Sequence, residues 1–419
     1  MDYNKMVNFD KNNIDPDCKI KVIGVGGGGG NAVNHMYQEG IEHVSFALCN
    51  TDKQVLEKSV IPTKLKIGPG LGAGGDPRKA QQIASENIDD IKALLSDGTE
   101  MAFVTATMGG GTGTGAGPIV AKVAKEMGIL TVGIVTIPFL FEGRNKILQA
   151  LDGVDEMAKN VDALLVINNE RLRTIYSDLI FDNAFKKADD TLTIAASSIV
   201  EMINIEGVIN IDFADVCATL RNGGVAVIST GYASGEGRVQ KAIDNALHSP
   251  LLNSTDVYKA KKILLNLVIN PKANFLMEET DAIHQFMGHF GRRFNFIWGY
   301  AYDATFDDDI KITILASGFG TDDIDKGIDI DPEDTKQGEI EDGRIREAYG
   351  DSFNGGMRQK RNKRYIHIFS EDELNDDDVI SIIDSSPTYE RDANAIKSLG
   401  KKQAQKQKET VENSNTITF

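Results

Sequence analysis

The sequence predicts an α/β fold in which a Rossmann-type, mostly parallel sheet is followed by a long central helix and a smaller α+β domain. Apolar strand segments alternate with helical segments as far as residue 167, which is typical of a parallel sheet with helices on both faces. One amphipathic helical pattern then runs over 183–204, and from residue 222 strand segments dominate. Beyond residue 320 the chain is acidic and poor in apolar residues, so we expect a disordered C-terminal tail.

The composition is that of a globular protein with a sizeable core, because 41% of the residues are hydrophobic and 26% are charged. The apolar, uncharged stretch 128–141 is shorter than the roughly 20 residues that a membrane-spanning helix needs. A net charge of −17 argues against broad nucleic-acid binding, which requires a basic face. The three cysteines lack disulfide spacing and no secretion signal opens the chain, so we expect a cytoplasmic protein.

In the first domain, five apolar segments that end in glycine or polar residues predict the strands 19–25, 44–49, 101–106, 129–137 and 163–167. Helices are expected to begin at Asn31, Pro77 and Pro118, since proline favours the first turn of a helix. The long helix is expected from a cap at Asn183 to about Asn204, because its apolar residues recur every three or four positions and form one stripe.

In the second domain, strands are expected at 225–230, 263–269, 295–302 and 311–316, with a helix at about 237–247. These segments predict the domain boundaries. The expected boundaries are a flexible N-terminal tail (1–17), a first α/β domain (18–183), the central helix (184–207), a loop with a connecting helix (208–221), an α+β domain (222–319), a disordered linker (320–378), a peptide that contains an apolar island (379–395) and a tail (396–419).

Three glycine-rich segments, 24–31, 68–76 and 107–115, carry the first functional indication. The first and the last lie between a predicted strand and a predicted helix, where backbone N–H groups and the positive end of a helix suit a phosphate. A Walker P-loop needs a Gly-Lys-Ser/Thr sequence, which this domain lacks, and a dinucleotide-binding fold needs only one such loop. Two loops from neighbouring strands therefore favour a polyphosphate that is held in another way.

An alternative is a dinucleotide-dependent oxidoreductase, because Gly24, Gly26 and Gly29 satisfy the G-x-G-x-x-G pattern. That function leaves the glycine segment 107–115 without a role. The sequence also offers no catalytic histidine or Tyr–Lys pair for hydride transfer.

The sequence Gly-Gly-Gly-Thr-Gly-Thr-Gly at 109–115 resembles the signature of the tubulin/FtsZ superfamily. The segments 26–31, 70–77, 138–143 and 210–215 are similar to the FtsZ family rather than to eukaryotic tubulin. The resemblance covers about residues 19–320. It implies a tubulin-like GTPase domain and a cell-division protein that forms filaments of the division ring, with GTP or GDP and Mg²⁺ as cofactors.

The resemblance also implies roles at the nucleotide. The first glycine segment would hold the α- and β-phosphates, 110–113 would form the main cradle, and 73–75 would lie near the γ-phosphate with Met108 close by. Glu142 would bind the ribose, and Arg144 or Lys146 would approach the phosphates. The implied binding residues are Gly27, Gly28, Gly29, Gly30, Asn31, Ala73, Gly74, Gly75, Met108, Gly110, Gly111, Thr112, Gly113, Glu142, Lys146, Phe185 and Asp189.

For the base, the resemblance implies that Phe185 stacks on guanine and that Asp189 accepts hydrogen bonds from its N1–H and N2–H. The two lie four residues apart and share a helix face. From the residues alone, a core phenylalanine and a solvated aspartate would be the simpler interpretations. Thr107 stands where the family more often has glycine, and Gly75-Asp76 replaces a more frequent Ala-Asn pair.

The first domain shows no obvious acid to position water for GTP hydrolysis. The candidates are Asn210, Asp212 and Asp215, which follow the long helix. The resemblance implies that this loop enters the nucleotide site of the next subunit, where both aspartates polarise the attacking water and Asn210 orients it. Taken by themselves, two aspartates three residues apart would indicate a helix cap. A second alternative is a filament scaffold that binds GTP but hardly hydrolyses it.

The apolar island within 379–395 resembles the FtsZ C-terminal peptide that docks onto membrane-anchor and regulatory division proteins such as FtsA. The linker would then act as a flexible tether that raises the effective concentration at the membrane. An inert acidic tail is the alternative. The expected partners are therefore other copies of this chain and division proteins, without nucleic acid or direct membrane insertion, at the mid-cell division site under the inner membrane.

Overall fold

The structure is a computed structural model that describes residues 7–8, 18–175, 181–205, 207–248, 257–290, 294–319, 343–345 and 348. All of them belong to one compact unit, 1–353. The described strands form a single sheet in the order β1 (Val7–Asn8), β4 (Thr63–Lys66), β3 (Val44–Asn50), β2 (Ile20–Val25), β5 (Met101–Thr107), β6 (Leu130–Ile137), β7 (Ala163–Asn168), β9 (Gly224–Ala233), β12 (Ile310–Phe319), β10 (Lys262–Ile269), β11 (Asn295–Tyr302) and β8 (Gly207–Ile209).

The predicted parallel sheet is confirmed over six neighbouring strands, from β4 to β7. Its central strands β2, β5 and β6 are buried almost throughout, which explains why they are nearly continuous apolar runs. Strand β9 joins β7 in parallel, while β12 runs antiparallel to both β9 and β10. The second domain therefore continues the sheet of the first.

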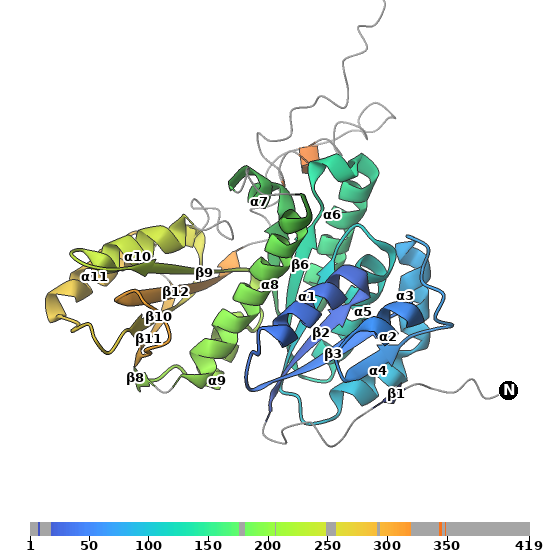
Figure 1. The fold of residues 1–419 in the computed structure, drawn as a ribbon, viewed down its shortest axis with the longest axis horizontal. Coiled ribbons are helices and arrows are strands. Elements are labelled where there is room, and N and C mark those ends of the chain that lie inside the picture. Colours follow the sequence, from blue (N-terminus) through green and yellow to red (C-terminus); the bar gives the residue numbers. More distant parts are fainter. Residues whose placement is uncertain are drawn as a thin grey trace, which may run out of the picture. The chain divides into compact units, whose positions relative to one another are not determined.

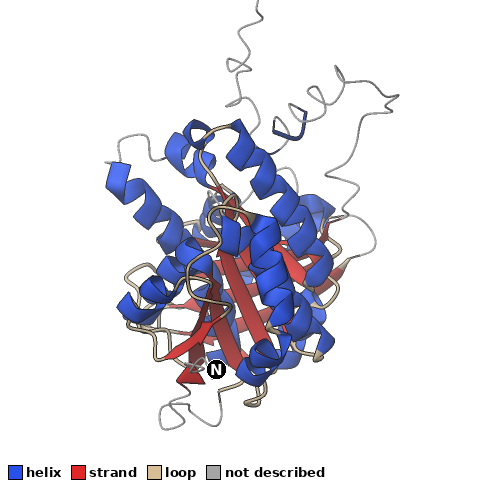
Figure 2. Cartoon of the chain, turned by 90° about the vertical axis from the view of Figure 1, so that its right-hand side faces the viewer, coloured by secondary structure: helices blue, strands red, loops and turns tan. Residues whose placement is uncertain are grey.

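Helices cover both faces of the sheet (Figures 1 and 2). Alternate residues of β2 separate the two cores, since Val22 packs with α1 and α8 while Ile23 packs with α3 to α6. The helices are α1 (Gly26–Gln38), α2 (Lys53–Lys58), α3 (Pro77–Glu86), α4 (Ile88–Leu95), α5 (Gly111–Glu126), α6 (Arg144–Asn160), α7 (Asn169–Ile175), α8 (Phe181–Asn204), α9 (Phe213–Leu220), α10 (Arg238–Leu247) and α11 (Thr280–Gly288), with short 3₁₀ turns η1 (Leu140–Glu142), η2 (Val257–Lys259) and η3 (Met277–Glu279).

Two predicted helix starts are wrong, although Pro77 does open α3 as expected. Helix α1 begins at Gly26 instead of Asn31, and α5 begins at Gly111, so Pro118 lies inside α5 rather than in its first turn. Glycine has weak helix propensity, which is why the sequence favoured loops here. Tertiary packing overrides this propensity, because the glycines let α5 lie directly against the backbone of α3.

The long helix is present as α8, which has 24 residues and starts two positions before the expected cap. At 1.5 Å per residue it is about 36 Å long. Its apolar stripe is buried in the same core as α1, with Leu192, Ala195 and Ile199 almost fully covered. Near its C-terminal end, Glu201 forms an ion pair with Lys311 of β12, which ties α8 to the second domain.

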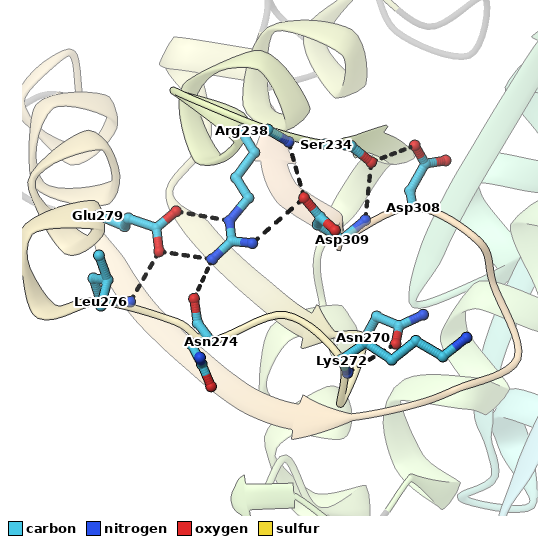
Figure 3. A network of polar contacts seen from close by, with 10 residues as sticks. Ser234, Arg238, Asn270, Lys272, Asn274, Leu276, Glu279, Asp308 and Asp309 are labelled. Atoms are coloured by element: carbon cyan, nitrogen blue, oxygen red, sulfur yellow. Dashed lines mark hydrogen bonds and ion pairs between the residues drawn. The ribbon is translucent and has the colours of Figure 1, made fainter.

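A buried arginine organises the second domain (Figure 3). Arg238, at the start of α10, donates Nε and Nη2 to the two carboxylate oxygens of Glu279, at 2.8 and 2.9 Å, and its Nη1 lies 3.5 Å from Asp309. The hydrogen bonds from Arg238 lower the pKa of Glu279. This bidentate pair fixes α10 against η3 and the start of β12.

No helix in the described part of the chain is both long and apolar enough to cross a membrane. The partner-binding peptide 379–395 and the tail 396–419 lie outside the described residues, as do most of the N-terminal tail 1–17 and most of the linker 320–378. Within that linker, the structure describes 343–345 and 348, which contact the first domain.

Gly110 and Gly115, both at the start of α5, allow a matched test of the close packing of α5 against α3. Gly115→Ala should lower the free energy of unfolding by about 1–3 kcal/mol, the usual cost of overpacking. The added Cβ would lie 2.0 Å from the backbone oxygen of Pro77. Gly110→Ala should change it by less than about 0.5 kcal/mol, since φ is −97° and no atom lies within 4 Å. Urea unfolding of both variants measures the difference, and equal stabilities would contradict this account.

Candidate functional site

Two helix N-termini meet at one edge of the sheet without side-chain caps. Strands β2 and β5 are parallel neighbours, so α1 and α5, which follow them, begin at the same edge. The first N–H groups of a helix have no intrahelical partner. In α2 and α3 the side chains of Asp52 and Asp76 accept from these groups, whereas α1 and α5 have no side-chain cap. Their N–H groups are therefore suited to an anion.

At this edge, some glycines leave no room for a side chain, whereas others have open space beside them. A Cβ on Gly26 would lie 2.8 Å from Gly113 N, and one on Gly28 would lie 2.2 Å from Thr107 Oγ1, so the two glycine segments interlock. By contrast, a Cβ on Gly27 or Gly110 would meet no atom within 4 Å. The structure thus brings the first two predicted segments together and leaves Gly27 and Gly110 on an open side.

The other predicted residues of these two segments take different positions. Gly29 and Gly30 are buried in α1, and Asn31 on the next turn is exposed. The hydroxyl of Thr112 lies 2.7 Å from the hydroxyl of Thr51, which joins α5 to the end of β3. Met108 is fully buried, so only its backbone can face a ligand.

The third glycine segment lies against the start of α5. A Cβ on Gly111 would lie 3.1 Å from both the Cβ of Ala73 and the carbonyl carbon of Gly75. Gly74 and Gly75 have φ values of +66° and +79°, which favour glycine, and the space beside both is open. The structure therefore places Ala73, Gly74 and Gly75 beside the second segment, as the phosphate-binding hypothesis requires.

Gln149 of α6 holds these segments together, and the sequence analysis missed it. Its Nε2 donates to the carbonyl oxygens of Gly109 and Gly110, both at 3.1 Å, and to that of Gly75 at 3.4 Å. One amide group thus bridges the second and third glycine segments. A lone glutamine inside an amphipathic helix offers no sequence signal for this role.

Glu142 and Lys146 contact each other. The Lys146 ammonium lies 2.5 Å from Glu142 Oε2, while the other oxygen, Oε1, accepts from Phe139 N at 2.8 Å. Lys146 is therefore held by Glu142 in this structure, and Arg144 is the first residue of α6. Lys146 lies one helical turn before Gln149 on α6, and Glu142 is the last residue of η1, which precedes that helix.

Phe185 and Asp189 lie near the start of α8, and neither fits the simpler interpretation. Phe185 is 41% exposed, so it is not a core side chain, and its ring contacts that of Phe139 nearly perpendicularly, with centroids 5.3 Å apart. Asp189 is half-buried, and burial raises the pKa of its carboxyl to about 6, with His35 lowering the pKa and Asp190 raising it. This carboxylate is therefore not an ordinary solvated group.

His35 connects the start of α8 to the glycine-bearing helix α1. Its Nε2 lies 3.1 Å from Asp190 Oδ1 and its Nδ1 lies 3.2 Å from Thr193 Oγ1, both on α8. These contacts hold the first half of α8, which carries the candidate base-binding residues, against the last turn of α1.

Asn169 is a second residue that the sequence analysis missed. It is the first residue of α7, at the end of β7, and is almost completely buried. Its amide oxygen has no hydrogen-bond partner within the described part of the chain. Buried polar atoms are normally paired, so an unpaired one at this edge marks a candidate ligand contact. An asparagine directly after a strand was the available signal.

The candidate catalytic residues lie at the opposite end of α8. Asp212 Oδ1 accepts from Asp215 N at 2.8 Å and Asp215 Oδ2 accepts from Asp212 N at 3.1 Å, which forms a capping box on α9. Asn210 Oδ1 accepts from Gly207 N at 3.2 Å. Because about 30 Å of α8 separates them from Phe185, the structure does not bring these residues to the glycine segments of the same chain.

Comparison with known proteins gives three family matches. Residues 19–177 match the GTPase domain of the Tubulin/FtsZ family, 224–320 match the C-terminal domain of the FtsZ family, and 360–406 match a model described as FtsZ, C-terminal. The cell division protein FtsZ of Porphyromonas gingivalis is 47% identical over 92% of this chain and 88% of its own length. That of Pseudomonas aeruginosa is 44% identical over 74% of this chain and 79% of its own length.

Solved structures agree with these matches. An FtsZ dimer from M. jannaschii is 36% identical, with a TM-score of 0.65 over 72% of this chain and 88% of its own. A protofilament of CetZ2 from Haloferax volcanii shares the fold, with 19% identity and a TM-score of 0.63 over 78% of this chain and 98% of its own. None of these matches supports the oxidoreductase alternative. The chain belongs to the FtsZ family, and it is a cell-division GTPase with a tubulin-like fold.

Proposed function

We propose that this chain hydrolyses GTP at a site shared by two consecutive subunits of a head-to-tail filament. The observation that carries the proposal is the length of α8, which puts about 30 Å of helix between Phe185 and the candidate catalytic acids. A single subunit would then hold GTP, and a second subunit would supply the acids.

In this proposal, main-chain N–H groups hold the phosphates. The uncapped starts of α1 and α5 supply the donors, and Gly27 and Gly110 leave the space that a phosphate would fill. The third glycine segment, positioned by Gln149, would lie at the terminal phosphate. Lys146 would add a positive charge by leaving Glu142, whose carboxylate would then bind the ribose.

The start of α8 would bind the base. The exposed face of Phe185 would stack on guanine, and the Asp189 carboxylate would accept from N1–H and N2–H. Adenine has an acceptor at N1, so the same carboxylate would select GTP over ATP. The unpaired amide oxygen of Asn169 would accept a hydrogen bond from the bound nucleotide.

Mg²⁺ would offset charge on the phosphates during phosphoryl transfer. Among the described residues, no group of three acidic, histidine or cysteine side chains is placed to bind a metal ion. The proposed ion would therefore take ligands from the nucleotide itself.

The residues that follow the C-terminal end of α8 are suited to an interface with another subunit. Asp212 and Asn210 are exposed, and Val208 and Ile209 beside them are apolar residues that are 68% and 39% exposed. An exposed apolar segment next to polar functional groups is typical of a binding surface. The M. jannaschii relative is described as a dimer, which supports self-association. A contact between unlike ends repeats into a filament instead of a closed dimer.

The capping box would orient the acids for catalysis. Each carboxylate uses one oxygen in the cap, which leaves the other oxygen of Asp212 and of Asp215 to polarise a water molecule. Asn210 would orient the same water in line with the terminal phosphate. The helix N-termini of the first subunit would stabilise charge on the phosphates, so positioning and electrostatics supply most of the rate. This preformed acid pair disfavours a scaffold that binds GTP but hardly hydrolyses it.

The shared site predicts how hydrolysis depends on assembly. GTP turnover per subunit should rise from near zero once the protein exceeds a critical concentration, measured as phosphate release with light scattering in parallel. Asp212→Ala should abolish turnover while GTP binding and filaments persist. Turnover that is independent of dilution would contradict the shared site, and loss of GTP binding in Asp212→Ala would contradict the assigned role.

A mixing experiment sharpens this test. Asp189→Ala should bind GTP weakly but keep its acids, while Asp212→Ala keeps its nucleotide site. At a fixed total concentration, an equimolar mixture should hydrolyse GTP faster than either variant alone, because mixed contacts pair an intact nucleotide site with intact acids.

The raised pKa of Asp189 predicts a pH dependence of binding. Only the ionised carboxylate accepts both guanine hydrogens, and its pKa in the free protein is about 6. GTP affinity should therefore be constant well above pH 6 and fall by up to roughly tenfold for each pH unit below it. Fluorescent-GTP titrations from pH 5 to 8 measure this, with Asp189→Asn as the control that should be weak and nearly pH-independent. A wild-type profile as flat as that of Asp189→Asn would rule out the assigned role.

The tail would connect the filament to the membrane at mid-cell. The match of 360–406 to the FtsZ C-terminal model includes the peptide 379–395 and supports its role in docking anchor or regulatory proteins of the FtsA type. Deleting 379–395 should leave GTP turnover unchanged and remove binding to such an anchor in a pull-down. Anchor binding that survives the deletion would favour the inert tail.

A further inference from the structure

A short piece of the tail docks on the GTPase domain. We name residues 343–348 the tail latch, of which 343–345 and 348 are described. In Figure 1 its short helical piece, drawn in orange, lies beside α6. The latch belongs to an acidic stretch in which 321–350 carries 11 acidic and 4 basic residues, so an ordered contact there was not expected.

Three different interactions hold the latch. Arg344 reaches two carboxylates one turn apart on α6, with Nη1 2.8 Å from Asp152 Oδ1 and Nη2 2.7 Å from Asp155 Oδ2. Ile345 is fully buried and joins the apolar core between α6 and the sheet. The side-chain amide of Asn168, at the end of β7, donates to the carbonyl oxygen of Ala348 at 2.6 Å.

Together these contacts are typical of a specific docking site, because they combine an ion pair, a buried apolar side chain and a hydrogen bond. An ion pair on an exposed surface contributes little by itself. Complete burial of Ile345 is the stronger contribution, since it removes a large apolar side chain from water. The arginine and the amide then fix the direction of the chain on either side of that isoleucine.

The site also lies on the elements that organise the nucleotide site. Asp152 is three residues after Gln149 on α6, and Asn168 directly precedes Asn169 at the end of β7. A docked latch therefore contacts both α6 and the end of β7.

We propose that the latch fastens the tail to the GTPase domain, so that the tether toward 379–395 is anchored at the latch beside α6 instead of at the end of β12. For a flexible chain, the average span from 320 to 378 is about 42 Å, whereas that from 349 to 378 is about 30 Å. The latch thereby shortens the tether and fixes where it leaves the subunit. Its consequence for membrane attachment rests on the proposed partner-binding role of 379–395, but the docking itself does not.

Limited trypsin digestion of the full-length protein with GDP tests the docking, because the latch carries its own cleavage sites, Arg344 and Arg346. Cleavage after them should be at least about tenfold slower than after Arg358, a tail arginine beyond the latch, since the protease needs an undocked chain. Equal rates in the wild type would overturn the proposal.

Variants of the docking site keep the cleavage sites intact. Asp152→Arg combined with Asp155→Arg should raise cleavage at Arg344 and Arg346 to the rate at Arg358. Lys159→Ala is the matched control, because Lys159 is an exposed charge on the same helix that pairs with Glu156 instead of the latch. It should digest like the wild type, and a control that digests like the arginine variant would also overturn the proposal.

A charge swap completes the design. Arg344→Asp alone should expose the Arg346 site, and adding Asp152→Arg and Asp155→Arg should restore its protection. Continued rapid cleavage in the swapped protein would count against the ion pair. The digestion does not depend on partner binding, so a protected latch in a protein that binds no anchor would refute the tail's partner role and leave the latch standing.

Discussion

Helix α8 is the constraint on which the rest of the structure depends. Its buried stripe locks it against the sheet, with Leu192 and Ile199 almost without exposure, and its contact with His35 sets its start beside α1. A helix held in this way cannot bend to bring its two ends together. The candidate base-binding residues near one end and the candidate acids after the other are therefore separated by about 30 Å of helix, so chemistry that needs both would require two subunits.

The candidate nucleotide site is shaped mainly by glycines, which have no side chain. Glycine at 26, 28 and 113 lets two helix starts approach more closely than any Cβ would permit, and this approach aims two sets of N–H groups at one place. Glycine at 27 and 110 serves the opposite purpose and keeps that place empty. Because the donors belong to the main chain, they are fixed by the fold. Gln149 adds hydrogen bonds to the carbonyl oxygens of Gly109 and Gly75, which join the second and third glycine segments.

The sequence predicted the fold well where the spacing of apolar residues reflects which side chains are buried. The stripe of α8 placed its start within two residues, and the apolar runs located the central strands. It failed at the glycine segments, because intrinsic propensity describes a single residue, whereas the helical turns there depend on contacts with α3 and β5. Gln149 and Asn169 were missed because one polar residue carries no pattern until its neighbours are known. Ile345 was missed for the same reason, because it is one of several isoleucines scattered through an acidic stretch.

The candidate site also contains groups that lower the stability of the folded protein when no ligand is bound. Two uncapped helix starts, an unpaired buried amide at Asn169 and a desolvated carboxylate at Asp189 each destabilise the empty protein. The apolar cores on both faces of the sheet offset this cost, so the groups can stay unsatisfied until a nucleotide arrives. Any molecule that pairs with them binds the folded state alone and adds RT ln(1 + [L]/Kd) to the free energy of unfolding. Nucleotide occupancy and the stability of the folded subunit would therefore be linked through these groups.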